Sequence, residues 1–221
     1  MNELTDWQPR PLPARVALEG RYARLEPLDS VRHGDQLFEA SMAPGAEQRF
    51  RYLSNGPQDR AGFEGWLAHA CASEDPLFYA VVDASTGRCE GRQALMRITP
   101  EHGVIEVGNV LWGPRIARSR VATEALFLQA RYVFELGYRR FEWKCNAENA
   151  PSKRAAERFG FTYEGLFRQH MVVKGANRDT DWYSMLDSEW PALERAYERW
   201  LAPGNFDERG QQNARLDIRK T

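Results

Sequence analysis

The chain has 221 residues, of which 43% are hydrophobic and 28% charged, with a formal net charge of −1. This length suits one α/β domain with short terminal extensions, and the apolar content is enough for a buried core. A net charge near zero gives no overall attraction to nucleic acid or anionic membrane, so neither is an expected partner and any anion site must be a local cluster. No apolar run reaches the roughly 18–20 residues that span a bilayer.

The chain contains three widely separated cysteines, Cys71, Cys89 and Cys145. Because they have neither the spacing of metal ligands nor a disulfide framework, we expect no metal and a reducing compartment. The N-terminus lacks the apolar core of a signal peptide, which favours a cytoplasmic location. We predict an irregular N-terminal arm over residues 1–19, a single domain over 20–201 and a loose polar tail over 202–221.

Periodicity and turn signals in the first half predict three strands and two helices. In chain order these are a strand over 20–28, a helix over 31–42, a helix capped by Asp59, and strands over 78–82 and 92–98. Pro44-Gly45 should end the first helix, and Asp59 is a good cap because its carboxylate can accept from the next turn.

The second half predicts a strand, a long helix and another strand over 104–112, 121–136 and 140–145. Elements in this order normally form a right-handed crossover that joins parallel strands. A helix from Pro151 to Gly160, two antiparallel strands over 161–169 and 180–186, and a final helix over 187–201 should follow. The whole pattern predicts a mixed α/β fold.

The loop before the long helix carries three arginines, Arg115, Arg118 and Arg120. A helix start presents unpaired N–H groups and a partial positive charge, and this one follows a strand of a strand–helix–strand unit. These features favour binding of a phosphate-bearing ligand. A solvated basic loop is the alternative, since the glycine pattern of phosphate loops is absent.

Glu106 lies inside the apolar strand 104–112, where an unpaired buried carboxylate is costly. It is therefore either ion-paired, solvated in a cleft or used for proton transfer. Regular alternation places Glu106 on one face with Gly108, Val110 and Trp112, with open space beside Gly108.

Asn149 and Ser152 begin the helix that follows the second parallel strand. They are either ordinary capping residues or ligands of a cofactor, in which Asn149 makes a hydrogen bond to the cofactor and the Ser152 hydroxyl faces its thiol. His170 lies on the late strands, and a lone histidine is more often structural than catalytic.

Three segments together resemble the GNAT superfamily of N-acetyltransferases: EVGNVLWGPRIARSRVATEAL, NAENAPSKRAAERFGF and EGLFRQHMVVKGANRDTDWYSML. They are most similar to its RimJ/RimL-like branch, named for enzymes that acetylate ribosomal-protein N-termini. The resemblance covers about residues 20–201 and is most specific over 105–186. It implies a mixed, mostly antiparallel sheet flanked by helices, in which two central parallel strands splay apart to hold acetyl-CoA.

The resemblance also implies roles for individual residues. The pantetheine arm should meet the backbone of Val110, Leu111 and Trp112. The pyrophosphate should meet the amides of Arg118, Ser119, Arg120, Val121, Ala122 and Thr123. Asn149 and Ser152 should approach the thioester.

Two positions depart from the family pattern. Arg120 stands where the loop Q/R-x-x-G-x-G/A has its central glycine, and we expect helical geometry to accept the arginine. Ala156 stands where many members have a tyrosine general acid. The glutamate that some ribosomal-branch enzymes use as base is matched by Met171, with His170 beside it on the opposite side of a regular strand.

The hypothesis is an N-acetyltransferase in which a primary amine attacks acetyl-CoA directly in a ternary complex. Glu106 is the favoured base, acting through water, and His170 is the second candidate. Ser152 assists the leaving thiolate. A strand N–H between Val110 and Trp112 stabilises the oxyanion.

The acceptor is either a peptide N-terminus, favoured by a wide acidic groove, or a small amine, favoured by an aromatic pocket around Phe50, Tyr52 or Trp182. The alternative function is a catalytically degenerate module that binds or senses acyl-CoA. Exposed late edge strands also suggest a homodimer.

Overall fold

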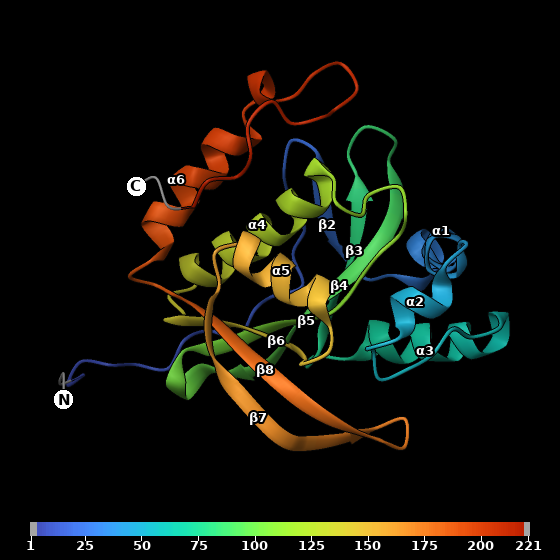
Figure 1. The fold of residues 1–221 in the computed structure, drawn as a ribbon, viewed down its shortest axis with the longest axis horizontal. Coiled ribbons are helices and arrows are strands. Elements are labelled where there is room, and N and C mark those ends of the chain that lie inside the picture. Colours follow the sequence, from blue (N-terminus) through green and yellow to red (C-terminus); the bar gives the residue numbers. More distant parts are fainter. Residues whose placement is uncertain (1–3, 219–221) are drawn as a thin grey trace.

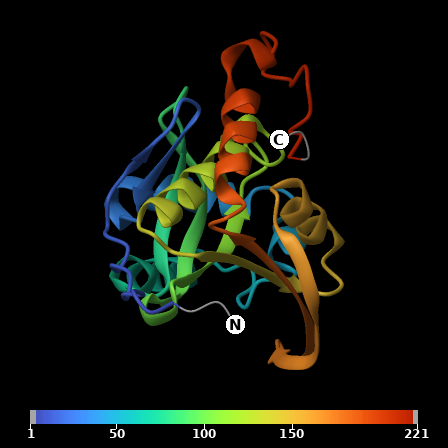
Figure 2. The same ribbon diagram turned by 90° about the vertical axis from the view of Figure 1, so that its left-hand side faces the viewer.

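The computed structural model describes residues 4–218. Its centre is one eight-stranded sheet of order β1-β2-β3-β4-β5-β6-β8-β7, with helices on both faces (Figures 1 and 2). Neighbouring strands are antiparallel except β5 and β6, which are parallel. The predicted mixed α/β architecture is confirmed. Within the described chain, no helix is long and apolar enough to cross a membrane.

The strands are β1 Leu18–Glu19, β2 Ala23–Pro27, β3 Leu77–Asp83, β4 Arg88–Thr99, β5 Val104–Trp112, β6 Arg140–Asn146, β7 Thr162–Val173 and β8 Ala176–Leu186. The helices are α1 Ser30–Met42, α2 Ala46–Phe50, α3 Arg60–Ala72, α4 Arg120–Glu135, α5 Ala150–Arg158 and α6 Trp190–Leu201, with 3-10 turns η1 Pro100–His102 and η2 Pro203–Asn205. The first predicted strand, 20–28, corresponds to β2, and β1 precedes it. The short helix α2 was not predicted, and the β7–β8 hairpin is longer than expected.

Local signals fix the helix ends. Asp59 caps α3 by accepting a hydrogen bond from the N–H of Gly62 at 2.8 Å, as predicted. Gly137 and Gly160 follow α4 and α5 with φ of 83° and 91°. Glycine adopts this left-handed conformation without the steric cost that a side chain brings, so both helices stop where the sequence indicated.

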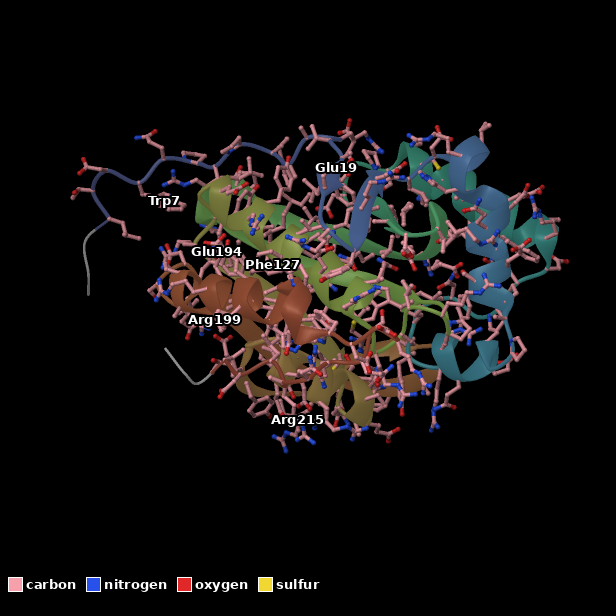
Figure 3. All side chains as sticks on the ribbon, turned by 90° about the horizontal axis from the view of Figure 1, so that it is seen from above. Trp7, Glu19, Phe127, Glu194, Arg199 and Arg215 are labelled. Carbon is pink, nitrogen blue, oxygen red and sulfur yellow. The ribbon has the colours of Figure 1, made fainter. Side chains whose placement is uncertain are left out.

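Each face of the sheet has its own apolar core. Leu37 of α1 and Phe63 of α3 pack on Phe78 and Ala80 of β3. On the other face, α4, α5 and α6 cover the centre of the sheet. Figure 3 shows α4 and α6 side by side, with Phe127 and Glu194 labelled, and Phe127 stacks on Tyr197 of α6 at a centroid distance of 5.2 Å.

The parallel pair is short. β5 and β6 pair only from Val104 opposite Arg140 to Val107 opposite Trp143. Beyond this point β5 continues beside β4, and β6 continues beside β8. The two central strands therefore separate into a wedge, as the family resemblance implied.

A bulge changes which way the end of β5 faces. Asn109 has φ of 52°, and the register with β4 shifts between Arg92 and Ala94. As a result Val110 and Trp112 pack against the α4 core rather than sharing the face of Glu106. The prediction of uninterrupted alternation along this strand is wrong, because the bulge inserts one residue between the two halves.

The terminal segments differ from each other. Residues 4–17 are irregular, whereas the end of the predicted arm forms β1. The Trp7 indole, labelled in Figure 3, donates to the carbonyl of Glu101 at 2.7 Å and holds this segment. The prediction of a loose tail is wrong for the described part. Phe206 packs on Trp200 at 5.0 Å, and the Trp200 indole donates to Gln212 at 3.0 Å. Residues 1–3 and 219–221 of the two predicted segments lie outside the described residues.

Candidate active site

A cavity of about 1360 Å³ occupies the wedge between β5 and β6 and reaches both faces of the sheet. We call its two parts the α4 end and the α2 end. The α4 end is lined by the start of α4, by α5 and by the C-terminal segment; the α2 end is lined by residues 48–54 and by side chains of β4 to β8.

The cavity walls are strongly cationic. Ten arginines and one lysine line it against two carboxylates, Asp83 and Glu106. The whole chain has a net charge of −1, so the positive charge is concentrated here rather than spread over the surface. Such a concave cationic surface raises the local concentration of anionic ligands.

Ser119 is the N-cap of α4, and its hydroxyl accepts from the N–H of Val121 at 3.1 Å and of Ala122 at 3.4 Å. Arg120 is the first residue of the helix. Its backbone is not left-handed, which confirms that helical geometry accepts arginine at the family's glycine position. The left-handed residue is Arg118, with φ of 61°.

The amides at this helix start are not equivalent. The N–H of Ser119 donates to Ile116 at 3.1 Å, and the N–H of Thr123 donates to Ser119 at 3.2 Å. Within residues 4–218, the N–H groups of Arg118 and Arg120 donate to no protein acceptor. The free donors at the α4 end are therefore fewer than the six amides that the family resemblance implied.

Arg158 is a site residue that sequence reasoning missed. Its Nη1 donates to the hydroxyl of Thr123 at 3.2 Å, and burial lowers the pKa of its guanidinium. Arg154 precedes it by four residues and also lines the cavity. The i, i+4 spacing on a helix was a readable signal, because it places both side chains on one face.

The C-terminal segment completes the α4 end. Arg209, Gly210 and Gln211 line the cavity. Arg120 lies over the ring of Tyr22 at 4.3 Å and over Phe206 at 5.2 Å, which joins this segment to the start of α4. Nothing in the sequence indicated that the chain returns here after its last helix.

Asn149 and Ser152 meet at the start of α5. The Asn149 side-chain oxygen accepts from the N–H of Ser152 at 3.2 Å, so Asn149 is an N-cap, and both residues line the cavity. The Trp143 indole donates to the Ser152 hydroxyl at 3.0 Å. A hydroxyl that accepts from an indole keeps its own proton available for donation.

Glu106 is buried, with 4% of its surface exposed. Its Oε2 lies 2.5 Å from Lys144 Nζ and 2.8 Å from Arg97 Nε. Burial raises the pKa of this carboxyl, while Lys144 and Arg97 oppose the rise. The expected open space beside Gly108 is absent, because the Met96 sulfur occupies the position that a Cβ would take.

His170 is not among the residues that line the cavity, whereas its neighbour Met171 is. The His170 Nδ1 lies 3.0 Å from the Thr180 hydroxyl. Burial and the charges of Lys144, Arg178 and Arg97 lower the pKa of His170, which favours the neutral ring.

The walls of the α2 end form neither of the two acceptor sites considered from the sequence, an acidic groove or an aromatic pocket. Tyr52 lines the cavity and donates to the carbonyl of Glu148 at 3.2 Å, whereas Phe50 is buried with 3% exposed. Lys144 lies over the Trp182 ring at 4.1 Å. This end is thus neither an acidic groove nor an aromatic pocket.

A cationic helix start at the mouth of two diverging parallel strands is the arrangement expected of an acyl-CoA-dependent N-acyltransferase. The family model of the acetyltransferase (GNAT) domain matches residues 24–162, more than half of the chain. The chain belongs to the GNAT acetyltransferase family.

Solved structures agree with this assignment. A GCN5-related N-acetyltransferase from Brucella melitensis is 61% identical, with a TM-score of 0.95 over 96% of this chain and 97% of that chain. A protein from Chromobacterium violaceum, described as a probable acetyltransferase of the GNAT family, is 41% identical with a TM-score of 0.80 over 86% and 96%. RimL, a ribosomal L7/L12 α-N-protein acetyltransferase, shares the fold at 18% identity and a TM-score of 0.68. No curated protein matches the chain.

Proposed function

We propose that this GNAT acetyltransferase moves the acetyl group of acetyl-CoA to a primary amine by direct attack in a ternary complex. The observation that carries the proposal is the pair of free N–H groups, of Arg118 and Arg120, at the start of α4. They adjoin the wedge between β5 and β6, where Arg158 adds a formal positive charge. Backbone donors and cations at a helix start suit a pyrophosphate.

The remaining parts of acetyl-CoA have matching walls. The Val110–Trp112 stretch follows the divergence of β5 from β6, where an extended pantetheine arm fits between the strands. Asn149 and Ser152 lie at the opposite wall, on α5, and would flank the thioester. The Ser152 proton is available for the departing thiolate, which suits a role in leaving-group stabilisation.

The α2 end would receive the amine. Its cations disfavour the charged ammonium form, so an amine bound there loses its proton more readily than in water. Glu106 is the proposed acceptor of that proton through water, and His170, outside the cavity lining, is the second candidate. A β5 backbone N–H between Val110 and Trp112 would stabilise the tetrahedral oxyanion.

Two finer assignments also belong to the proposal. The motif resemblance supports membership of the RimJ/RimL-like branch. The edge strand β7 exposes large apolar side chains, including Phe167 at 52% and Val172 at 80%, which would suit a homodimer interface.

The test has two stages. Thermal unfolding is first measured with increasing acetyl-CoA, and release of the CoA thiol is then followed with a panel of peptides and small amines. A higher unfolding midpoint together with amine-dependent thiol release supports the enzyme. Binding without release from any acceptor would instead favour an acyl-CoA-sensing module. An unchanged midpoint at saturating acetyl-CoA would refute both.

A further inference from the structure

We propose that the amine acceptor also carries an anionic oxygen group, a carboxylate or a phosphate, which Arg178 binds at the α2 end of the cavity. The inference rests on the proposed function, because it describes the acceptor of the same site. It makes the substrate zwitterionic rather than a simple alkylamine or polyamine.

Arg178 is a cavity-lining residue of β8 whose charge is not satisfied within the protein. Its side chain makes no hydrogen bond or ion pair with any residue in the described range, and its Nε is buried without a partner. Burial lowers the pKa of this guanidinium. Arg178 is half-buried and its charge has no carboxylate partner among the described residues, so an external anion in the cavity is the expected partner.

No neighbouring carboxylate can serve Arg178 instead. Glu106 is the carboxylate that lines the α2 end, and its Oε2 is already bonded to Arg97 and Lys144. Arg49, at the same end, donates to main-chain carbonyls, one of them Pro44 at 2.9 Å. These carbonyls accept hydrogen bonds from Arg49 but do not neutralise its positive charge. Four cations therefore face one carboxylate at this end.

A second unsatisfied donor lies on the same face of β8. Side chains two residues apart on a strand share a face, so Arg178, Thr180 and Trp182 point the same way. The Trp182 indole N–H is buried without an acceptor, whereas the Thr180 hydroxyl is engaged by His170. Trp182 is outside the cavity lining, so Arg178 is the residue of this strand face whose donors a ligand in the cavity can reach.

The phosphates of acetyl-CoA do not fill this role. Their proposed donors, the N–H groups of Arg118 and Arg120, are at the α4 end. The side chains of Arg178 and Glu106 face the cavity from the α2 end, where the amine would enter. The acceptor is thus the substrate able to neutralise Arg178. A guanidinium suits it because the planar fork can bind two oxygens of one carboxylate or phosphate.

The experiment uses matched acceptors that differ only in the anionic group. The panel contains α-amino acids with their amides, β-alanine with β-alaninamide, and O-phosphoethanolamine with ethanolamine. Equilibrium binding to the CoA-loaded protein is measured by thermal shift, and turnover with acetyl-CoA by thiol release. We expect the tightest binders to be the acceptors that carry the anionic group, with at least a tenfold preference over the partners that lack it. The carboxylate and phosphate pairs identify which oxygen group is recognised.

The variants Arg178→Gln and Arg178→Lys separate recognition from folding. We expect the preference to fall towards one in Arg178→Gln and to survive in part in Arg178→Lys, while affinity for acetyl-CoA stays unchanged in both. Arg60→Gln, at an exposed site, is the matched control and should keep the full preference.

Three outcomes would overturn the proposal. Acceptors without the anionic group could bind as tightly as their partners that carry it. Arg178→Gln could slow all acceptors equally, which would place Arg178 at the thioester instead. Arg178→Gln could also lose affinity for acetyl-CoA, which would indicate a structural role. Anion binding that depends on Arg178 but gives no turnover would support the anion site and refute acetyl transfer, so the two failures are distinguishable.

Discussion

Replacing Lys144 with methionine tests the buried ion pair at the centre of the cavity. The side chains of Lys144 and Glu106 are only 3% and 5% exposed, and Glu106 would keep Arg97 as its one remaining cation. Removing one partner of a buried pair typically costs about 3–5 kcal/mol. Because Arg97 remains, we expect about 3 kcal/mol, or roughly 6–12 °C in the unfolding midpoint of a chain of this size.

The stability lost in Lys144→Met should be greater at high pH than at low pH. Burial raises the folded-state pKa of Glu106, so the folded protein holds this proton more tightly than the unfolded chain. The resulting stability is fully present below the ordinary carboxyl pKa of about 4.3 and is lost as pH rises through the folded value. Lys144→Met removes the strongest opposing charge and raises the folded pKa further. The midpoint difference from wild type should therefore be larger at pH 8 than at pH 5.

Thermal unfolding of four proteins at both pH values provides the assay. These are the wild type, Lys144→Met, Glu106→Gln and the double variant, which should recover most of the lost stability because no buried charge is left unpaired. Arg60→Met, which breaks two exposed pairs, with Asp35 and Glu64, is the control and should leave the midpoint nearly unchanged. A loss that is the same at both pH values, or that persists in the double variant, would refute the reasoning.

Further predictions concern single residues of the cavity. Arg158→Ala should raise the KM for acetyl-CoA about 10- to 100-fold with little change in kcat, since it removes a cation beside the helix start; steady-state kinetics check this, and an unchanged KM would contradict it. Ser152→Ala should lower kcat roughly fivefold at constant KM for acetyl-CoA, the value of one neutral hydrogen bond. Arg118→Gly should raise stability by about 0.5–1 kcal/mol by relieving its positive φ, whereas Arg118→Ala, which keeps the strain, should not.

Much of the fold could be predicted from local signals. The caps at Asp59 and the stops at Gly137 and Gly160 are contained in a few adjacent residues, and the apolar stripe of α4 repeats with helical period. The bulge at Asn109 escaped prediction because a left-handed asparagine has no firm signature in sequence. Its consequence is large, since one inserted residue reverses the facing of Val110 and Trp112.

The site was predicted in part for the same reason. The helix start at Ser119 and the cap at Asn149 depend on contacts within three residues, which the sequence contains. The pairing of Glu106 with Lys144, on the next strand, and with Arg97 depends on the sheet register, which the sequence alone does not supply. The three alternatives for Glu106 therefore stayed open at the level of sequence. That Arg178 lacks a hydrogen-bond or ion-pair partner could not be predicted, because it depends on which side chains the fold places around it.

The C-terminal segment lies beyond residues 24–162, which match the family domain, yet Arg209 and Gln211 line the α4 end of the cavity. Under the proposed function, this segment would add to the coenzyme-binding wall that the start of α4 and α5 form within the family domain. Changes in the segment after α6 would then alter coenzyme binding and leave the central strands unchanged. Relatives with the same central sheet but different C-terminal ends should thus span a range of coenzyme affinities.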